Sequence, residues 1–162
     1  MDWHDFAGIA GAYAIARTIL DRGDAERAQA AADAQAAQEA WEVGQQMEAL
    51  VSDIDDVIVD DLNAAWTAPD PGTAVIAWAR RAEPKLRRYR DRWGTWWGRS
   101  PEGDELVERW QTALDGYIEA IELIRAEDPD GPGRLVRAMT DYKDHQAWLR
   151  AQAIALGWRP EE

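Results

Sequence analysis

The sequence has no cysteine, only two histidines and a single phenylalanine among its 162 residues. Without cysteine the chain forms no disulfide, no thiolate metal site and no cysteine nucleophile. The histidines, His4 and His145, lie near opposite ends of the chain, so no paired-histidine metal spacing occurs. A glycine-rich phosphate loop and a strand to precede it are also missing. We therefore expect a protein that is not an enzyme and that needs no metal or cofactor.

Long apolar runs are scarce as well. The most apolar segment, residues 6–20, contains Arg17. It is shorter than the ~20 apolar residues that a helix needs to span a bilayer. No basic region precedes this segment, so we do not expect a signal peptide. Together with the lack of cysteine, these features favour a cytoplasmic protein.

Basic residues are few relative to acidic ones. The chain has 18 basic and 31 acidic residues, and its net charge is −13. Nucleic acid and anionic membranes repel a chain of this charge. The exception is the segment 73–100, which carries 8 basic and 2 acidic residues between two acidic flanks. We therefore do not expect the chain as a whole to bind nucleic acid, and only residues 80–99 offer a local site for it.

Apolar residues recur at helical spacing through most of the chain. Residues 24–66 predict one unusually long helix, with an alanine-rich first half and an apolar face along its second half. Two prolines and a glycine in residues 67–72 end this helix. A third helix follows from Thr73, which can serve as its cap, and its apolar spacing continues across Pro84. Ser100 and Pro101 then predict a clear helix start, and a last helix is expected over residues 134–156.

These segments predict an all-α fold with a long central helix, an antiparallel helical bundle and an N-terminal helical arm. We expect residues 41–162 to form a four-helix bundle. Residues 1–40 would form the arm, which projects or folds back along the long helix and provides contacts to an oligomer or partner.

The first helix of the arm carries apolar residues on nearly all of its sides. The residues that we expect to contact a partner are Phe6, Ile9, Tyr13 and Leu20. Small residues between them would let another backbone approach closely. We expect this helix to bind a second copy of the chain or another protein. Contact with a membrane surface is an alternative that we do not favour.

A second candidate partner site is the segment 80–99, where arginines alternate with aromatic residues. Its main candidates are Arg88, Arg92, Trp93, Trp96 and Trp97. Tryptophan and arginine dominate the hot spots of protein interfaces. The same residues suit single-stranded nucleic acid, since cations bind phosphate and rings stack on bases. We favour a third interpretation, in which the arginines pair with the aspartates of the long helix and the tryptophans close one end of the bundle.

Two polar residues lie on predicted buried faces. Helical geometry places Asp61 on the apolar face of the long helix, between Val57 and Ala65. A buried carboxylate without a partner is costly, so we expect a basic group or several hydrogen-bond donors to meet it. His145 lies on the apolar face of the last helix, where a histidine is usually a hydrogen-bonded core or rim residue.

The stretch EAWEVGQQMEAL, which spans residues 39–50, resembles the first motif helix of the all-α nucleoside triphosphate pyrophosphohydrolases. The resemblance implies magnesium held by an ExxE pair and by an ExxD pair on a second helix. Here Gln45 stands three residues after Glu42, where the pattern has an acidic residue, and Asp53 and Asp56 follow on the same helix. A metal-dependent nucleotide pyrophosphohydrolase is therefore a minor alternative.

The function that these features favour is that of a structural or adaptor protein without catalytic activity. It would act by self-association or by binding a protein partner. The main alternative is a regulatory module that binds nucleic acid through residues 80–99.

Overall fold

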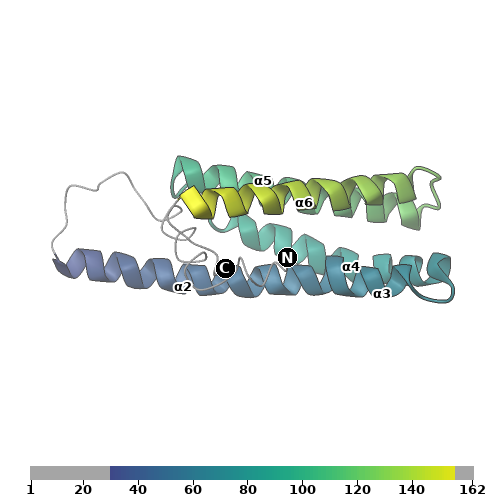
Figure 1. Ribbon diagram of the computed structural model, residues 1–162, viewed down its shortest axis with the longest axis horizontal. Coiled ribbons are helices and arrows are strands. Elements are labelled where there is room, and N and C mark those ends of the chain that lie inside the picture. Colours follow the sequence, from purple (N-terminus) through teal and green to yellow (C-terminus); the bar gives the residue numbers. More distant parts are fainter. Residues whose placement is uncertain (1–29, 156–162) are drawn as a thin grey trace.

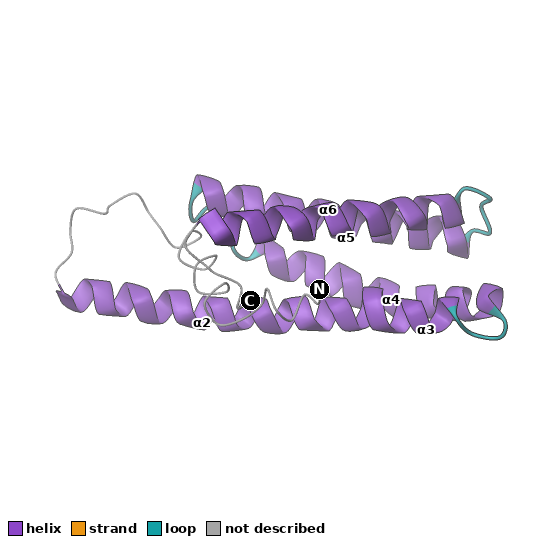
Figure 2. Cartoon of the chain, in the orientation of Figure 1, coloured by secondary structure: helices purple, strands orange, loops and turns teal. Residues whose placement is uncertain are grey.

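The computed structural model describes residues 30–155, and Figure 1 shows this part as long helices that run alongside one another. The first is α2 (Ala30–Asp55), which continues through the π-helical segment η2 (Asp56–Asp61) into α3 (Leu62–Trp66). It is followed by α4 (Pro71–Gly94), α5 (Pro101–Arg125) and α6 (Gly131–Ala155). Figure 2 shows only helices and short loops in this part, so the predicted all-α fold is confirmed.

The ends of the helices follow from local chemistry. Ser100 caps α5 by accepting a hydrogen bond from the Gly103 amide at 3.0 Å, and Pro101 takes the first helical position, as predicted. Thr73 is not the cap of α4. Asp70 is the cap instead, because its Oδ1 accepts a hydrogen bond from the Thr73 amide at 3.3 Å. Pro84 lies inside α4 without ending it.

The helices pack in chain order. α3 packs on α4, α4 on α5, and α5 on α6. The turn between α5 and α6 is tight, because a Cβ atom at Gly131 would lie 3.0 Å from the backbone nitrogen of Ile124. Figure 1 shows α5 and α6 on one side of the bundle and the α2–α3 rod on the other. The core between them contains these fully buried large side chains: Trp78, Trp93, Trp110, Tyr117, Ile54, Leu62, Leu86, Leu114, Ile121, Leu135 and Leu149.

The π-helical segment overturns the prediction for Asp61. A regular α-helix would place Asp61 beside Val57 on the buried face, but the turns of η2 are wider than α-helical turns. Leu62 takes the buried position and is 1% exposed, whereas Asp61 is exposed to solvent. The predicted buried carboxylate at residue 61, and the partner expected for it, are therefore wrong.

The N-terminal part of α2 extends past the ends of the other helices (Figure 1). Gln35, Ala36, Gln38 and Glu39 are exposed there. This stretch belongs to the same helix as the bundle part of α2, so the chain has no break at residue 40. The rest of the predicted arm, with Phe6, Ile9, Tyr13 and Leu20, lies outside the described residues.

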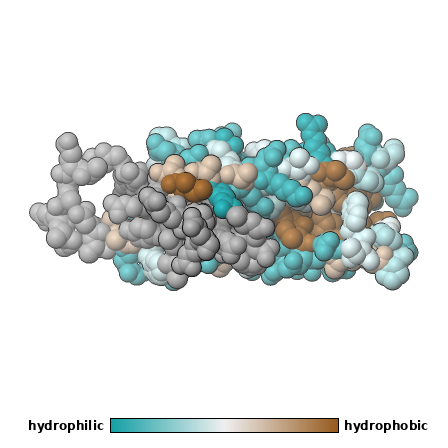
Figure 3. All heavy atoms as spheres, in the orientation of Figure 1, coloured by the Kyte–Doolittle hydropathy of each residue, from teal (hydrophilic) through white to brown (hydrophobic). Residues whose placement is uncertain are grey.

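The described surface in Figure 3 is mostly hydrophilic, and hydrophobic residues gather toward the end where α3 and the α5–α6 turn lie. The large apolar side chains that are exposed are Val59, Trp66, Trp97, Val136 and Ile154. Among the described residues, no helix is both long and apolar enough to cross a membrane.

Candidate functional site

The structure divides the tryptophans of the segment 80–99 between core and surface. Trp93 is 1% exposed and Trp96 is 3% exposed, so both belong to the core and neither is available to a partner. Trp93 stacks on Trp110 with ring centroids 4.7 Å apart and an interplanar angle of 8°. Trp97 is 44% exposed and its Nε1 donates a hydrogen bond to Gln111 Oε1 at 3.0 Å. The partner role expected for Trp93 and Trp96 is thus replaced by a packing role, and Trp97 stays at the surface.

Five of the six arginines of α4 fall into two sets. Arg87 forms ion pairs with Glu83 of its own helix and with Glu122 of α5, and Arg90 pairs with Asp115 of α5. These pairs connect α4 to α5, and not to the aspartates of the long helix as we expected. Hydrogen bonds to the carboxylates raise the pKa of both guanidinium groups.

The second set of arginines lies on the outer face of α4. Arg81, Arg88 and Arg92 are exposed and recur at helical spacing. None of them forms an ion pair with another described residue. These three arginines are called the basic face of α4 below.

Asp55, which was not among the residues predicted to be buried, is the buried carboxylate of the described long helix. It is 7% exposed, and the Tyr142 hydroxyl of α6 donates a hydrogen bond of 2.7 Å to its Oδ1. Burial, and then the Asp55 charge, raise the pKa of Tyr142 well above its ordinary value. Its spacing in the sequence does indicate burial, because Asp55 follows Val51 by four residues and precedes Ile58 by three.

His145 of α6 is 6% exposed and lies among aromatic rings. Its ring meets Trp110 edge-on at 4.6 Å and stacks on Trp148 at 6.1 Å. Neither of its ring nitrogens has a hydrogen-bond partner among the described residues. Burial, and then the nearby Arg109 charge, lower the pKa of His145 to about 3. The imidazole is therefore neutral at physiological pH, with one nitrogen that donates and one that accepts.

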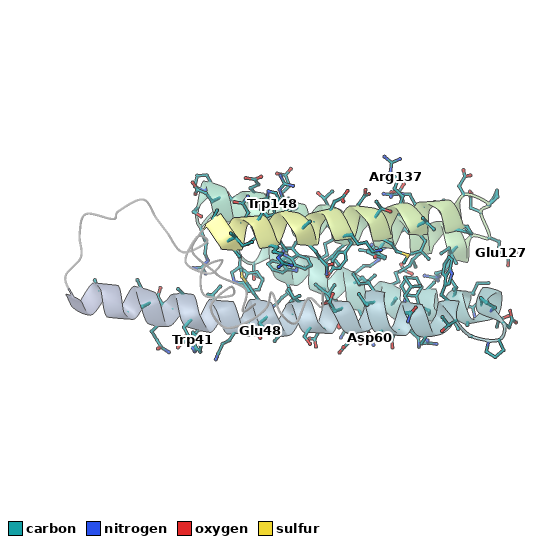
Figure 4. The ribbon with its side chains drawn as sticks, in the orientation of Figure 1. Trp41, Glu48, Asp60, Glu127, Arg137 and Trp148 are labelled. Carbon is teal, nitrogen blue, oxygen red and sulfur yellow. The ribbon has the colours of Figure 1, made fainter. Side chains whose placement is uncertain are left out.

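His145 lines a groove of about 480 Å³ between α5 and α6, called the α5–α6 groove below. Figure 4 shows Trp148 and Arg137 on the outer side of this helix pair, away from α2, whereas Glu48 of α2 and Asp60 of η2 project on the opposite side of the bundle. The residues that line the groove are Glu105, Glu108, Arg109, Thr112, Ala113, Gly116, Arg134, Asp141, Asp144 and His145.

Both arginines of the α5–α6 groove are paired. Arg109 pairs with Glu105 at 3.0 Å, and its guanidinium carbon lies 4.1 Å from the centre of the Trp148 ring. Arg134 pairs with Glu119 at 2.7 Å, and its Nη1 is buried without a partner among the described residues. The carboxylates of Glu108, Asp141 and Asp144 form no ion pair within the described part of the chain. The groove is therefore acidic overall.

The described residues contain no group of three or more histidine, cysteine, aspartate or glutamate side chains placed to hold a metal ion. Asp53, Asp56 and Asp60 are exposed on the outer face of the long helix. Comparison with protein-family models, curated proteins and solved structures gives no match for this chain. Similarity to the all-α pyrophosphohydrolases thus remains limited to the short stretch at residues 39–50.

Proposed function

We propose that this protein is a self-associating helical adaptor without catalytic activity, and that it binds copies of itself or an acidic protein partner. The observation that supports this proposal is the basic face of α4. Arg81, Arg88 and Arg92 are exposed and without partners among the described residues, in a protein whose net charge is −13. A basic surface on an acidic protein complements the rest of another copy of the same chain.

The pairing within the bundle supports the same conclusion. Arg87 and Arg90 already pair with Glu122 and Asp115 of α5. The neighbouring Arg88 and Arg92 are exposed to solvent. Arginine is enriched at protein interfaces because its planar guanidinium binds carboxylates through two parallel hydrogen bonds. The N-terminal helix with Phe6, Ile9, Tyr13 and Leu20 would add an apolar contact, as its sequence predicts.

The alternative of nucleic-acid binding has less support. A single-stranded nucleic acid needs aromatic rings that are free to stack on bases. Trp93 and Trp96 are in the core, which leaves Trp97 as the one exposed tryptophan of residues 80–99. The basic face of α4 alone would give only weak contacts that depend on salt. We also propose a cytoplasmic location, on the basis of the lack of cysteine.

Light scattering of the full chain at low and high salt tests the proposal. We expect a mass above that of the monomer at low salt, and a lower mass at high salt because salt screens exposed charges. The double variant Arg88→Gln with Arg92→Gln should shift the protein toward the monomer. The matched control removes two exposed cations of α6 through Arg137→Gln with Lys143→Gln, and should keep the wild-type mass.

Three results would contradict this function. A monomer at every salt concentration would rule out self-association. An equal loss of association in the control variant would assign the effect to net charge. Tight binding of single-stranded DNA that disappears in the Arg88 and Arg92 variant would favour the nucleic-acid alternative.

A further inference from the structure

The α5–α6 groove lies on another surface from the basic face of α4, and self-association leaves it without a role. Its floor contains His145, a polar side chain that is 6% exposed and lacks hydrogen-bond partners among the described residues. Buried polar groups nearly always have a partner in folded proteins. A buried side chain that faces a groove without a partner is typical of a group that contacts a ligand.

The walls of the groove determine the charge of that ligand. Glu108 on α5 and Asp141 and Asp144 on α6 are exposed carboxylates without ion pairs among the described residues. Arg109 and Arg134 are each neutralised by a glutamate of α5. Three free carboxylates, contributed by both helices that line the groove, attract a cation and can pair with more than one positive group.

The floor of the groove determines the chemistry of the cation. One ring nitrogen of His145 can accept a hydrogen bond. Both ring nitrogens are buried, so the side chains around the groove must shift slightly before an ammonium N–H can donate to it. Ala113 and Thr112 also line the groove and can provide apolar contacts. The described residues offer no metal-binding cluster, which argues against a divalent metal ion here. The groove volume of about 480 Å³ falls within the usual range for small ligands.

We propose that the α5–α6 groove binds a linear aliphatic polyamine, with its ammonium groups on Glu108, Asp141 and Asp144 and one N–H donated to His145. The methylene segments of the polyamine lie against Ala113 and Thr112. The same alkylammonium chemistry occurs in lysine side chains, so the experiment must separate a free polyamine from a lysine-rich peptide.

Calorimetric titration of the full chain with spermidine tests the proposal. We expect saturable binding of one molecule per chain. Asp141→Asn with Asp144→Asn should weaken binding by about tenfold, since two ion pairs are lost. The matched control, Asp56→Asn with Asp60→Asn, removes the same charge from exposed positions on the outer face of the long helix and should leave the affinity nearly unchanged.

A second measurement reports on the floor of the groove. The chain has only two histidines, so the imidazole carbon-bound protons of His145 can be followed by NMR with little overlap. Spermidine should shift the resonances of His145 and leave those of His4 in place. His145→Leu should weaken spermidine binding several-fold while the protein stays folded, as checked by its melting temperature.

The proposal fails if spermidine does not saturate the protein or if the control variant loses as much affinity as the groove variant. Equal His145 shifts with magnesium chloride would indicate general charge attraction and would also overturn it. A trilysine peptide that binds at least about tenfold more tightly than spermidine would assign the groove to a protein segment instead.

Discussion

Asp55 and His145 are both buried polar residues of the described bundle, and they differ in how their hydrogen-bonding capacity is used. Asp55 of the long helix accepts a hydrogen bond from Tyr142 at 2.7 Å. His145, only three residues beyond Tyr142 on α6, has no partner for either ring nitrogen among the described residues. Tyr142 therefore lies on the side of α6 that faces the long helix, whereas His145 lines the α5–α6 groove.

The difference separates a structural polar group from a candidate binding group. A bonded buried carboxylate connects two helices and fixes how they pack, and its removal is expected to reduce stability. A buried imidazole without partners reduces stability in the folded protein, because its desolvation is not compensated. Such a group is expected where a ligand can provide the missing hydrogen bond.

The largest expected effect on stability comes from Trp110, whose ring contacts residues near both Asp55 and His145. Trp110 contacts Trp93, Tyr142 and His145. Trp110→Ala should lower the free energy of unfolding by ~3–5 kcal/mol, since it leaves a cavity in the core. Urea denaturation measures this change. The half-exposed Trp97 is the control, and Trp97→Ala should cost much less; equal losses would show that Trp110 is not central to the core.

Acid should act next most strongly, through His145. Its pKa falls from an ordinary 6.5 to about 3 in the folded protein, so the unfolded chain binds more protons between these values. Stability is therefore lost as pH falls from about 6.5 toward 3, by an amount on the order of 4 kcal/mol. His145→Leu should lose less stability than the wild type over this range in parallel denaturation curves. Identical pH profiles would refute the assigned burial.

The bonded region should show a smaller effect. Tyr142→Phe removes the hydroxyl that donates to Asp55, and we expect the free energy of unfolding to fall by ~1–3 kcal/mol. Tyr89→Phe is the control, because Tyr89 is partly exposed. The raised pKa of Tyr142 also predicts that stability present below about pH 10 is lost as pH rises further. Thermal melts at several pH values test both points.

The smallest change is expected from His145→Leu at neutral pH. The leucine removes two polar atoms that lack partners and keeps most of the apolar contact with Trp110. We therefore expect the free energy of unfolding to change by less than ~1 kcal/mol, or to rise slightly. If this variant were strongly destabilised, His145 would have a structural bond, and the contrast with Asp55 would disappear.

Helical spacing was enough to predict the fold class and most of the helix ends. The Ser100 cap, Pro101 and the break at residues 67–72 are local signals, and the structure reproduces them. Spacing failed at residues 56–61, because an α-helical wheel assumes one constant turn. The wider turns of η2 depend on packing against the other helices, including the Trp78 Nε1 bond to the Val57 carbonyl at 2.8 Å. No local pattern in the sequence predicts that contact.

The candidate sites were harder to predict than the fold. Trp93, Trp96 and Trp97 lie close together in the sequence, and we treated them as one site. In the structure Trp93 and Trp96 are in the core, whereas Trp97 is at the surface. The sequence predicts that His145 lies on an apolar face, but it does not predict the groove beside it. Glu108 and Asp141 line the same groove only because α5 packs on α6. Contacts between separate helices are absent from a one-dimensional pattern.

The π-helical segment also bears on how the length of this chain can vary. Compared with an α-helix, η2 holds roughly one more residue per turn, as a single inserted residue would produce. A deletion of one residue at an exposed position such as Asp60 would let this stretch become α-helical, while Met47 and Ala65 on either side would still face the core. The segment is thus a point along the long helix where the loss of one codon would do little damage to the bundle.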